Sequence, residues 1–178
     1  MSYYTLIGAL IVPADTEDPF AFFDEAAPRF QGGSRSGHFH STIRTLLDLM
    51  PGHESLRFLS AEMATKEDHA ADGTTSFTLL DHAELAVVKN ELDHLIDDIP
   101  RHIDSLPTHL LSEWGGTLRI LDALQRARSL QGGTYEVPDN EDGDSPDFFF
   151  GVLAILGGLC RSALDGTSKL LVYNWLPR

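Results

Sequence analysis

Short apolar runs near the two ends of the chain predict strands. Residues 4–12 read YTLIGALIV and end at Pro13, and residues 170–175 read LLVYNW and are followed closely by Pro177. Runs of this length that are rich in β-branched and aromatic residues and bounded by proline are typical of strands. We therefore expect one buried strand near each end of the chain.

A third strand is predicted at residues 74–80, which read TTSFTLL. The turn signal Asp72-Gly73 precedes it and predicts a hairpin whose first strand lies in residues 56–65. The pattern of residues 56–65, LRFLSAEMAT, fits either a strand or a helix. The composition of residues 31–37, QGGSRSG, predicts a flexible loop.

The strongest helical pattern covers residues 82–99, between the N-cap candidate Asp81 and the helix-breaking Pro100. Its apolar residues recur at helical spacing and form one stripe: Leu85, Val88, Leu92, Leu95, Ile96 and Ile99. Val87 is the one residue that departs from this pattern. The opposite face is polar and carries Asn90, Asp93, His94, Asp97 and Asp98.

Other segments predict further helices. Helices are expected at residues 20–27 after Pro19, at residues 42–50 after the cap candidate Ser41, and from Pro107 to Trp114. Residues 148–164 are apolar almost all round, which predicts a helix at the centre of the core.

Residues 117–130 predict another helix, which ends before Gly132-Gly133. We expect one side of it to face inward with Leu118, Leu121 and Leu124. The other side would then face solvent with Arg119, Arg126 and Arg128.

The order of these elements predicts a single α+β domain over residues 1–178. Its middle is mainly helical. A small sheet would combine the N-terminal strand, the central hairpin and the C-terminal strand, with the two terminal strands adjacent. No internal repeat or domain boundary interrupts the chain.

The charge of the chain narrows the classes of partner. Thirteen Lys and Arg face 27 Asp and Glu, for a net charge of −14. Such a surface repels nucleic-acid phosphates and anionic lipids, so we expect neither nucleic acid nor a membrane as a partner. It favours a basic protein, or it serves solubility alone.

The acidity is concentrated in two segments. Residues 62–104 carry eleven acids and three cations, and residues 136–147 carry six acids and no cation, so the rest of the chain is balanced. Because screening lengths of about 8 Å are shorter than the radius of such a domain, each segment acts as a local patch. The predicted partner-binding residues are Glu91, Asp93, Asp97, Asp98, Asp139, Glu141, Asp142 and Asp144.

These features predict a protein-binding inhibitor or adaptor for a basic partner, of the kind of a bacterial immunity protein that neutralises a toxin or effector. Small size, acidic patches and the lack of a recognisable catalytic motif favour this hypothesis. The sequence leaves open whether the protein is an enzyme and leans against it. No catalytic residue, metal ligand or cofactor is predicted.

Two alternatives remain. A metal-dependent enzyme would use His38 and His40, which share a face if they lie on a strand, or Glu91 and His94, which form one Glu-x-x-His pattern. A structural or oligomeric module would instead use the Phe-rich helix or the terminal strand as an interface. The oligomeric state is left open.

The remaining expectations concern the compartment and the single cysteine. Cys160 lies in an apolar run and predicts a buried, inert thiol, and one cysteine excludes an internal disulfide. The apolar run near the N-terminus has no Lys or Arg ahead of it, which speaks against a secretory signal. Residues 148–160 are too short for the ~20 residues that span a bilayer. The expected location is cytoplasmic.

Overall fold

The structure is a computed structural model, and it describes residues 4–18, 29–35, 38–60, 66–69, 71, 73–130 and 145–177. Five antiparallel strands form one sheet in the order β2-β1-β5-β4-β3. The strands are β1 Tyr4–Val12, β2 Arg29–Arg35, β3 Lys66–His69, β4 Gly73–Leu80 and β5 Lys169–Pro177. The predicted α+β fold is confirmed.

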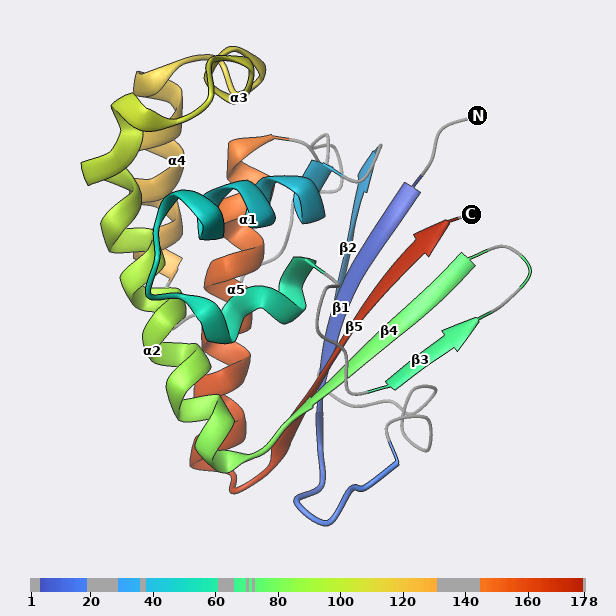
Figure 1. Ribbon diagram of the computed structural model, residues 1–178. Coiled ribbons are helices and arrows are strands. Elements are labelled where there is room, and N and C mark those ends of the chain that lie inside the picture. The colour runs from blue at the N-terminus through green and yellow to red at the C-terminus, as the bar shows by residue number, and fades with distance from the viewer. Residues whose placement is uncertain are drawn as a thin grey trace.

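The helical elements lie on one side of the sheet (Figure 1). They are α1 His38–Leu49, η2 Glu54–Ser60, α2 His82–Asp98, η3 Ile99–Ser105, α3 Thr108–Glu113, α4 Thr117–Leu130 and α5 Pro146–Asp165, where η marks a 3₁₀ helix. Helix α5 lies at the centre of this layer and contacts α2, α4, β1 and β5. The prediction of a central, apolar helix is therefore confirmed.

The two terminal strands are neighbours in the sheet, as expected. Strand β5 lies between β1 and β4 and pairs antiparallel with both, so it is the middle strand. Its side chains alternate between two apolar clusters. Leu170 and Val172 belong to the main core beneath the helices, whereas Leu171 and Tyr173 belong to a second cluster with Leu10, Val12 and Phe77.

Helix α5 is long and apolar enough to cross a membrane by length and composition, but 72% of its apolar window is buried inside the protein. It is capped by Ser145, whose hydroxyl accepts from the Phe148 amide, and Pro146 occupies the first turn. Phe149 packs against Phe39 of α1 and Trp114 with ring centroids 5.1 Å and 5.2 Å apart. This helix is a core helix.

The expected loop at residues 31–37 is wrong for residues 31–35, because Arg29–Arg35 form the edge strand β2, and residues 36–37 lie outside the described residues. Gly32 and Gly33 pair with Ile7 and Leu6 of β1 through the backbone alone. Glycine weakens a strand but is tolerated at an edge, where a neighbouring strand supplies the hydrogen bonds. The local composition therefore did not indicate strand β2, which depends on pairing with β1.

The helix expected after Ser41 begins earlier, at His38, so Ser41 is inside α1 and is not its cap. His38 and His40 therefore lie on a helix and not on a strand, and residues two apart on a helix point in different directions. The strand on which the shared face of this pair depended is therefore not formed.

The register expected for α4 is also wrong, although its bounds are confirmed. Leu118 is 83% exposed and Leu121 is 37% exposed, whereas Leu124 is buried. The inward side instead carries Ile120, Ala123, Leu124 and Ala127. Two alanines belong to this buried stripe, so a prediction from the leucine positions alone turned the wrong face of the helix inward. The expected outward arginines are confirmed as exposed.

The central hairpin is confirmed in kind, with a different first strand. Residues Lys66–His69, part of the segment expected to be the turn, pair with Thr74–Phe77 of β4. The ambiguous segment begins with the 3₁₀ helix η2. The helix expected at residues 20–27 lies outside the described residues.

A buried polar bridge ties the helices to the middle strand. Asn174 of β5 donates from Nδ2 to the carbonyl of Phe58 in η2 at 3.1 Å, and its Oδ1 lies 2.9 Å from Nε2 of His40 in α1. Because Asn174 offers its oxygen to the imidazole, Nε2 of His40 is the donor and Nδ1 is left bare. Nδ1 is buried without a partner.

Burial is the main reason why the pKa of His40 is lowered from its ordinary value, with a smaller contribution in the same direction from Arg44. The hydrogen bond with Asn174 acts in the opposite direction and does not outweigh burial. Protonation would place a proton on Nδ1 in an environment without an acceptor. The folded state therefore favours the neutral form of His40.

We expect the free energy of unfolding to fall as the pH drops below about 6.5, because the unfolded chain then takes up a proton at His40 more readily than the folded chain. Above that pH the stabilising contribution of the neutral ring is fully present. His40→Gln, which keeps a donor for Asn174 but does not titrate, should be less stable at pH 8. It should also lose less stability than the original protein between pH 6.5 and pH 5. Urea unfolding at several pH values measures both, and equal slopes would contradict the role of His40.

A second test concerns Gly8 of β1, which lies opposite Tyr173 of β5. A Cβ atom at Gly8 would overlap the ring of Tyr173, which is almost fully buried. Gly8→Ala should therefore destabilise the protein by about 1–3 kcal/mol in urea unfolding. Gly157→Ala is the matched control, because its Cβ would meet only Oδ1 of Asp93 at 4.0 Å and alanine favours a helix. Similar losses in both variants would rule out the close approach as the cause.

Candidate functional site

Helix α2 positions the first group of predicted partner-binding acids. Asp81 caps it by accepting from the Glu84 amide at 2.9 Å, and the Glu84 carboxylate accepts from the Asp81 amide at 2.9 Å, which completes a capping box. The expected apolar stripe is buried, and Val87 is half-exposed. The acids occupy the remaining surface of the helix.

Glu91 is bound to the 3₁₀ helix η2. Its Oε2 accepts from the backbone amide of Ser55 at 3.0 Å and from the Ser55 hydroxyl at 2.5 Å. One carboxylate oxygen thus satisfies an amide and a hydroxyl at the start of η2. This residue fixes η2 against α2.

Asp98 lies seven residues after Glu91, so it falls on nearly the same side of the helix. Its Oδ2 is 3.3 Å from Nε2 of the buried His53, and its Oδ1 accepts from Nη1 of Arg101 at 2.9 Å. Glu91 and Asp98 therefore both face the segment that runs from His53 into η2.

Asp93 and Asp97 point away from Glu91 and Asp98, by about 100–160° around the helix axis. Asp93 pairs with Lys89 at 2.6 Å, one turn earlier on the same helix. Asp97 pairs at 3.2 Å with Arg128 of α4, which also donates to the carbonyl of Ile96 at 3.4 Å. This pair joins α2 to α4.

The four acids of α2 therefore form two pairs and not one continuous face. Asp93, Asp97 and Asp98 each have a cationic partner, and Glu91 has a serine. Asp97 and Asp98 lie in the last turn of α2, which contains no basic residue, so the helix dipole opposes them and their partners from elsewhere compensate. The other four candidates, Asp139, Glu141, Asp142 and Asp144, lie outside the described residues.

One acid of the predicted cation-free loop lies in a helix instead. Asp147 is in the first turn of α5, 8% exposed, and its carboxylate contacts Arg119 at 2.5 Å and Nε of Arg126 at 2.8 Å. The hydrogen bond with Asp147 is the main reason why the pKa of Arg126 is raised. The sequence Ser145-Pro146-Asp147 carries the signal of a helix start, which could have placed this acid inside the helix.

The histidines proposed for metal or acid–base chemistry do not converge. His40 is committed to the bridge with Asn174, Glu91 is bound by Ser55, and His94 is exposed on α2. Within the part of the chain that the structure describes, no three His, Cys, Asp or Glu side chains lie close enough to share a metal ion.

Comparison with known proteins adds nothing to this picture. No protein-family model, no curated protein and no solved structure matches the chain. Its function is therefore inferred from its own residues.

Cys160 is a buried free thiol in α5, as predicted. Burial raises its pKa to about 12, and nearby Lys89 offsets only part of this effect. At neutral pH the group is a thiol and not the nucleophilic thiolate.

We expect Cys160 to resist alkylation by iodoacetamide at pH 8 in the native protein and to react fully in guanidinium chloride. The matched control is Cys160→Ser combined with Ser112→Cys, which moves the only thiol to an exposed position on α3. That variant should react in the native state, and mass spectrometry counts the modified chains. Rapid labelling of native Cys160 would show that the site opens.

Proposed function

We propose that the protein binds a basic protein partner and acts as an inhibitor or adaptor, in the manner of a bacterial immunity protein that neutralises a toxin or effector in the cytoplasm. The observation on which this proposal rests is that acids outnumber cations, so that ion pairing within the chain leaves acids in excess. Eighteen acids and twelve cations lie in the described residues, and nine acids and one cation lie in the remainder. Both parts of the chain are negative.

The way in which the acids of α2 are held supports binding. Asp97 is more than half exposed although Arg128 contacts it, and a carboxylate can accept further hydrogen bonds beyond one such contact. A carboxylate already fixed by one partner loses less conformational entropy when a second cation arrives. The C-terminal end of a helix also carries partial negative charge, which adds to the potential there.

Electrostatic complementarity of this kind acts mainly on the rate of association. A negative end of the helical layer would steer a basic partner toward α2 and α4 before close contacts form. The competing hypothesis is that the acids serve solubility only, in which case no particular acid affects the rate of association with one partner.

The test compares two double variants that remove equal charge from different parts of the protein. Asp93→Asn with Asp97→Asn removes two charges from one side of α2, and it leaves the Asp98–His53 contact intact. The matched control is Glu17→Gln with Asp165→Asn. Asp165 is the last residue of α5, and the end of α5 lies beside the start of α2, away from Asp97 in the last turn of α2 (Figure 1). Both control residues are exposed.

The partner used in this test is a protein that co-purifies with the unmodified chain at low salt. We expect the α2 variant to associate with it about three- to tenfold more slowly at low salt and to show a weaker salt dependence, with the control unchanged. Stopped-flow measurement at two salt concentrations gives both values, and thermal unfolding checks that the variants are folded. Equal rates for the two variants would leave solubility as the explanation.

A further inference from the structure

The described part of the protein exposes large apolar side chains at three positions, and two of them are neighbours on α4. Leu118 is 83% exposed and Leu121 is 37% exposed, and the third residue is Val87 of α2. Leu118 and Leu121 are three residues apart, so they lie side by side on the outer surface of the helix. Single exposed apolar residues are ordinary, so the adjacent pair is the feature to be explained.

The charged residues of α4 already have partners. Its three arginines contact three aspartates, in the pairs Arg119–Asp147, Arg126–Asp122, Arg126–Asp147 and Arg128–Asp97. These three positive and three negative charges cancel, so the surface around the two leucines is close to neutral. What this surface leaves uncovered is therefore apolar area and not an unpaired charge.

The neutrality of this surface indicates which partner it suits. The chain has a net charge of −14, so two copies repel each other wherever their acids face one another. On α4 the nearby charges cancel, and a screening length of about 8 Å weakens the effect of more distant acids. A basic protein gains no attraction from a neutral surface and is drawn to the acids instead. The pair of leucines therefore suits a second copy of this chain.

The surfaces that the sequence suggested for an oligomer are covered within the protein. In helix α5, 72% of the apolar window is buried, and strand β5 has a neighbouring strand on either side. Contact between two copies therefore requires another apolar surface, and α4 presents one.

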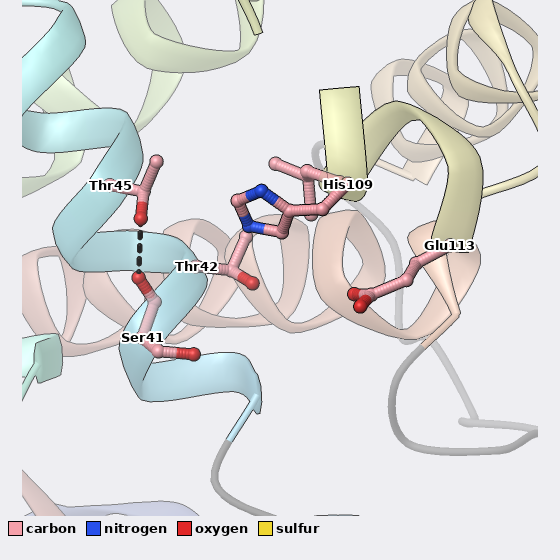
Figure 2. A pocket seen from close by; sticks show the side chains of 6 residues that line it. Ser41, Thr42, Thr45, His109 and Glu113 are labelled. Carbon is pink, nitrogen blue, oxygen red and sulfur yellow. Dashed lines mark hydrogen bonds between the residues drawn. The ribbon is translucent and has the colours of Figure 1, made fainter. Parts of the chain in front are cut away.

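The small hollow between α1 and α3 is not such a surface. Its volume is about 140 Å³, and Figure 2 shows polar side chains from both helices around it. The Thr45 hydroxyl donates to the Ser41 carbonyl at 2.9 Å, and none of the lining residues has a buried polar atom without a partner. The hollow therefore holds no group that requires a ligand.

The turn before α4 leaves space for a close approach. Gly115 and Gly116 form this turn with φ angles of 79° and 92°. A Cβ atom placed on Gly116 would have no atom within 4 Å. The end of α4 that carries Leu118 is therefore accessible.

We propose that α4 is the contact surface of a weak symmetric dimer of this chain. A two-fold axis perpendicular to α4 and between Leu118 and Leu121 sets Leu118 of each copy against Leu121 of the other. Both leucines then leave water, and the paired charges remain at the rim. Helix α4 has 14 residues and is about 21 Å long, so the interface is smaller than those of stable dimers.

Sedimentation velocity of the full chain measures the dimer directly. We expect a dissociation constant of about 0.1–1 mM, in keeping with an interface of this size. Raising the salt concentration from about 0.05 M to about 0.5 M should strengthen the dimer about threefold, because salt screens the repulsion between two acidic copies. A monomer at about 1 mM in both salt concentrations overturns the proposal, and so does a dimer that weakens with salt.

The direction of the salt effect separates this contact from the proposed function. Association with a basic partner weakens as the salt concentration rises, whereas the dimer strengthens. Loss of one interaction therefore leaves the other measurable.

Two variants locate the contact. Leu118→Gln combined with Leu121→Gln replaces two exposed leucines by another good helix former, so the chain should fold and remain monomeric. Val87→Gln is the matched control, because it removes an exposed apolar side chain from α2, and it should dimerise like the original chain. Thermal unfolding checks that both variants are folded. A dimer that persists in the double variant, or that is lost in the control as well, overturns the proposal.

Cross-linking tests the arrangement of the two copies. Chains with Leu118→Cys are mixed with chains with Leu121→Cys and treated with oxidised glutathione, and the buried Cys160 does not compete. The mixed disulfide should form about tenfold faster than in a mixture of Leu118→Cys and Val87→Cys chains, because a disulfide requires Cα atoms about 4.4–6.8 Å apart. Equal rates in the two mixtures overturn the proposed dimer.

Discussion

The burial of helix α5 on nearly all sides is the constraint on which the rest of the structure depends. A helix that is apolar all round needs cover from every direction, and here the sheet, α2 and α4 supply it. Each large apolar side chain removed from water contributes about 1.5–3 kcal/mol, so this cover is a main source of stability. The one acid near its start, Asp147, is tolerated because Arg119 and Arg126 hold it.

The same constraint explains which elements the sequence predicted well. Strand β1, helix α2 and helix α5 carry long apolar patterns, and their positions follow from periodicity because burial itself imposes the pattern. Helix α4 packs against α5, and its buried face includes the small residues Ala123 and Ala127. Its bounds were predictable, but its face was assigned to the larger Leu118, which is exposed.

Elements without an apolar pattern escaped prediction. Strand β2 is held by backbone pairing with β1, and β3 is the charged segment Lys66–His69 at the other edge of the sheet. Edge strands are commonly short and charged, which guards against pairing with other chains. Such strands exist because a neighbour offers hydrogen bonds, and that information is not local in the sequence.

The residues of the candidate site were also predictable only in part from the sequence. The sequence placed the acids of α2 on a helix and on its polar surface, but the partners of Glu91 and Asp97 are distant in the chain. Ser55 lies 36 residues before Glu91, and Arg128 belongs to a different helix from Asp97.

The position of β5 has a consequence for synthesis of the protein. This strand is the last of the described elements in chain order, yet it lies in the middle of the sheet. While a ribosome is still making the preceding residues, β1 and β4 have no strand between them, and β1 can pair only with β2. The two halves of the sheet, β2-β1 and β4-β3, can therefore join only after β5 has been made, and until then one edge of β1 and one edge of β4 are unpaired.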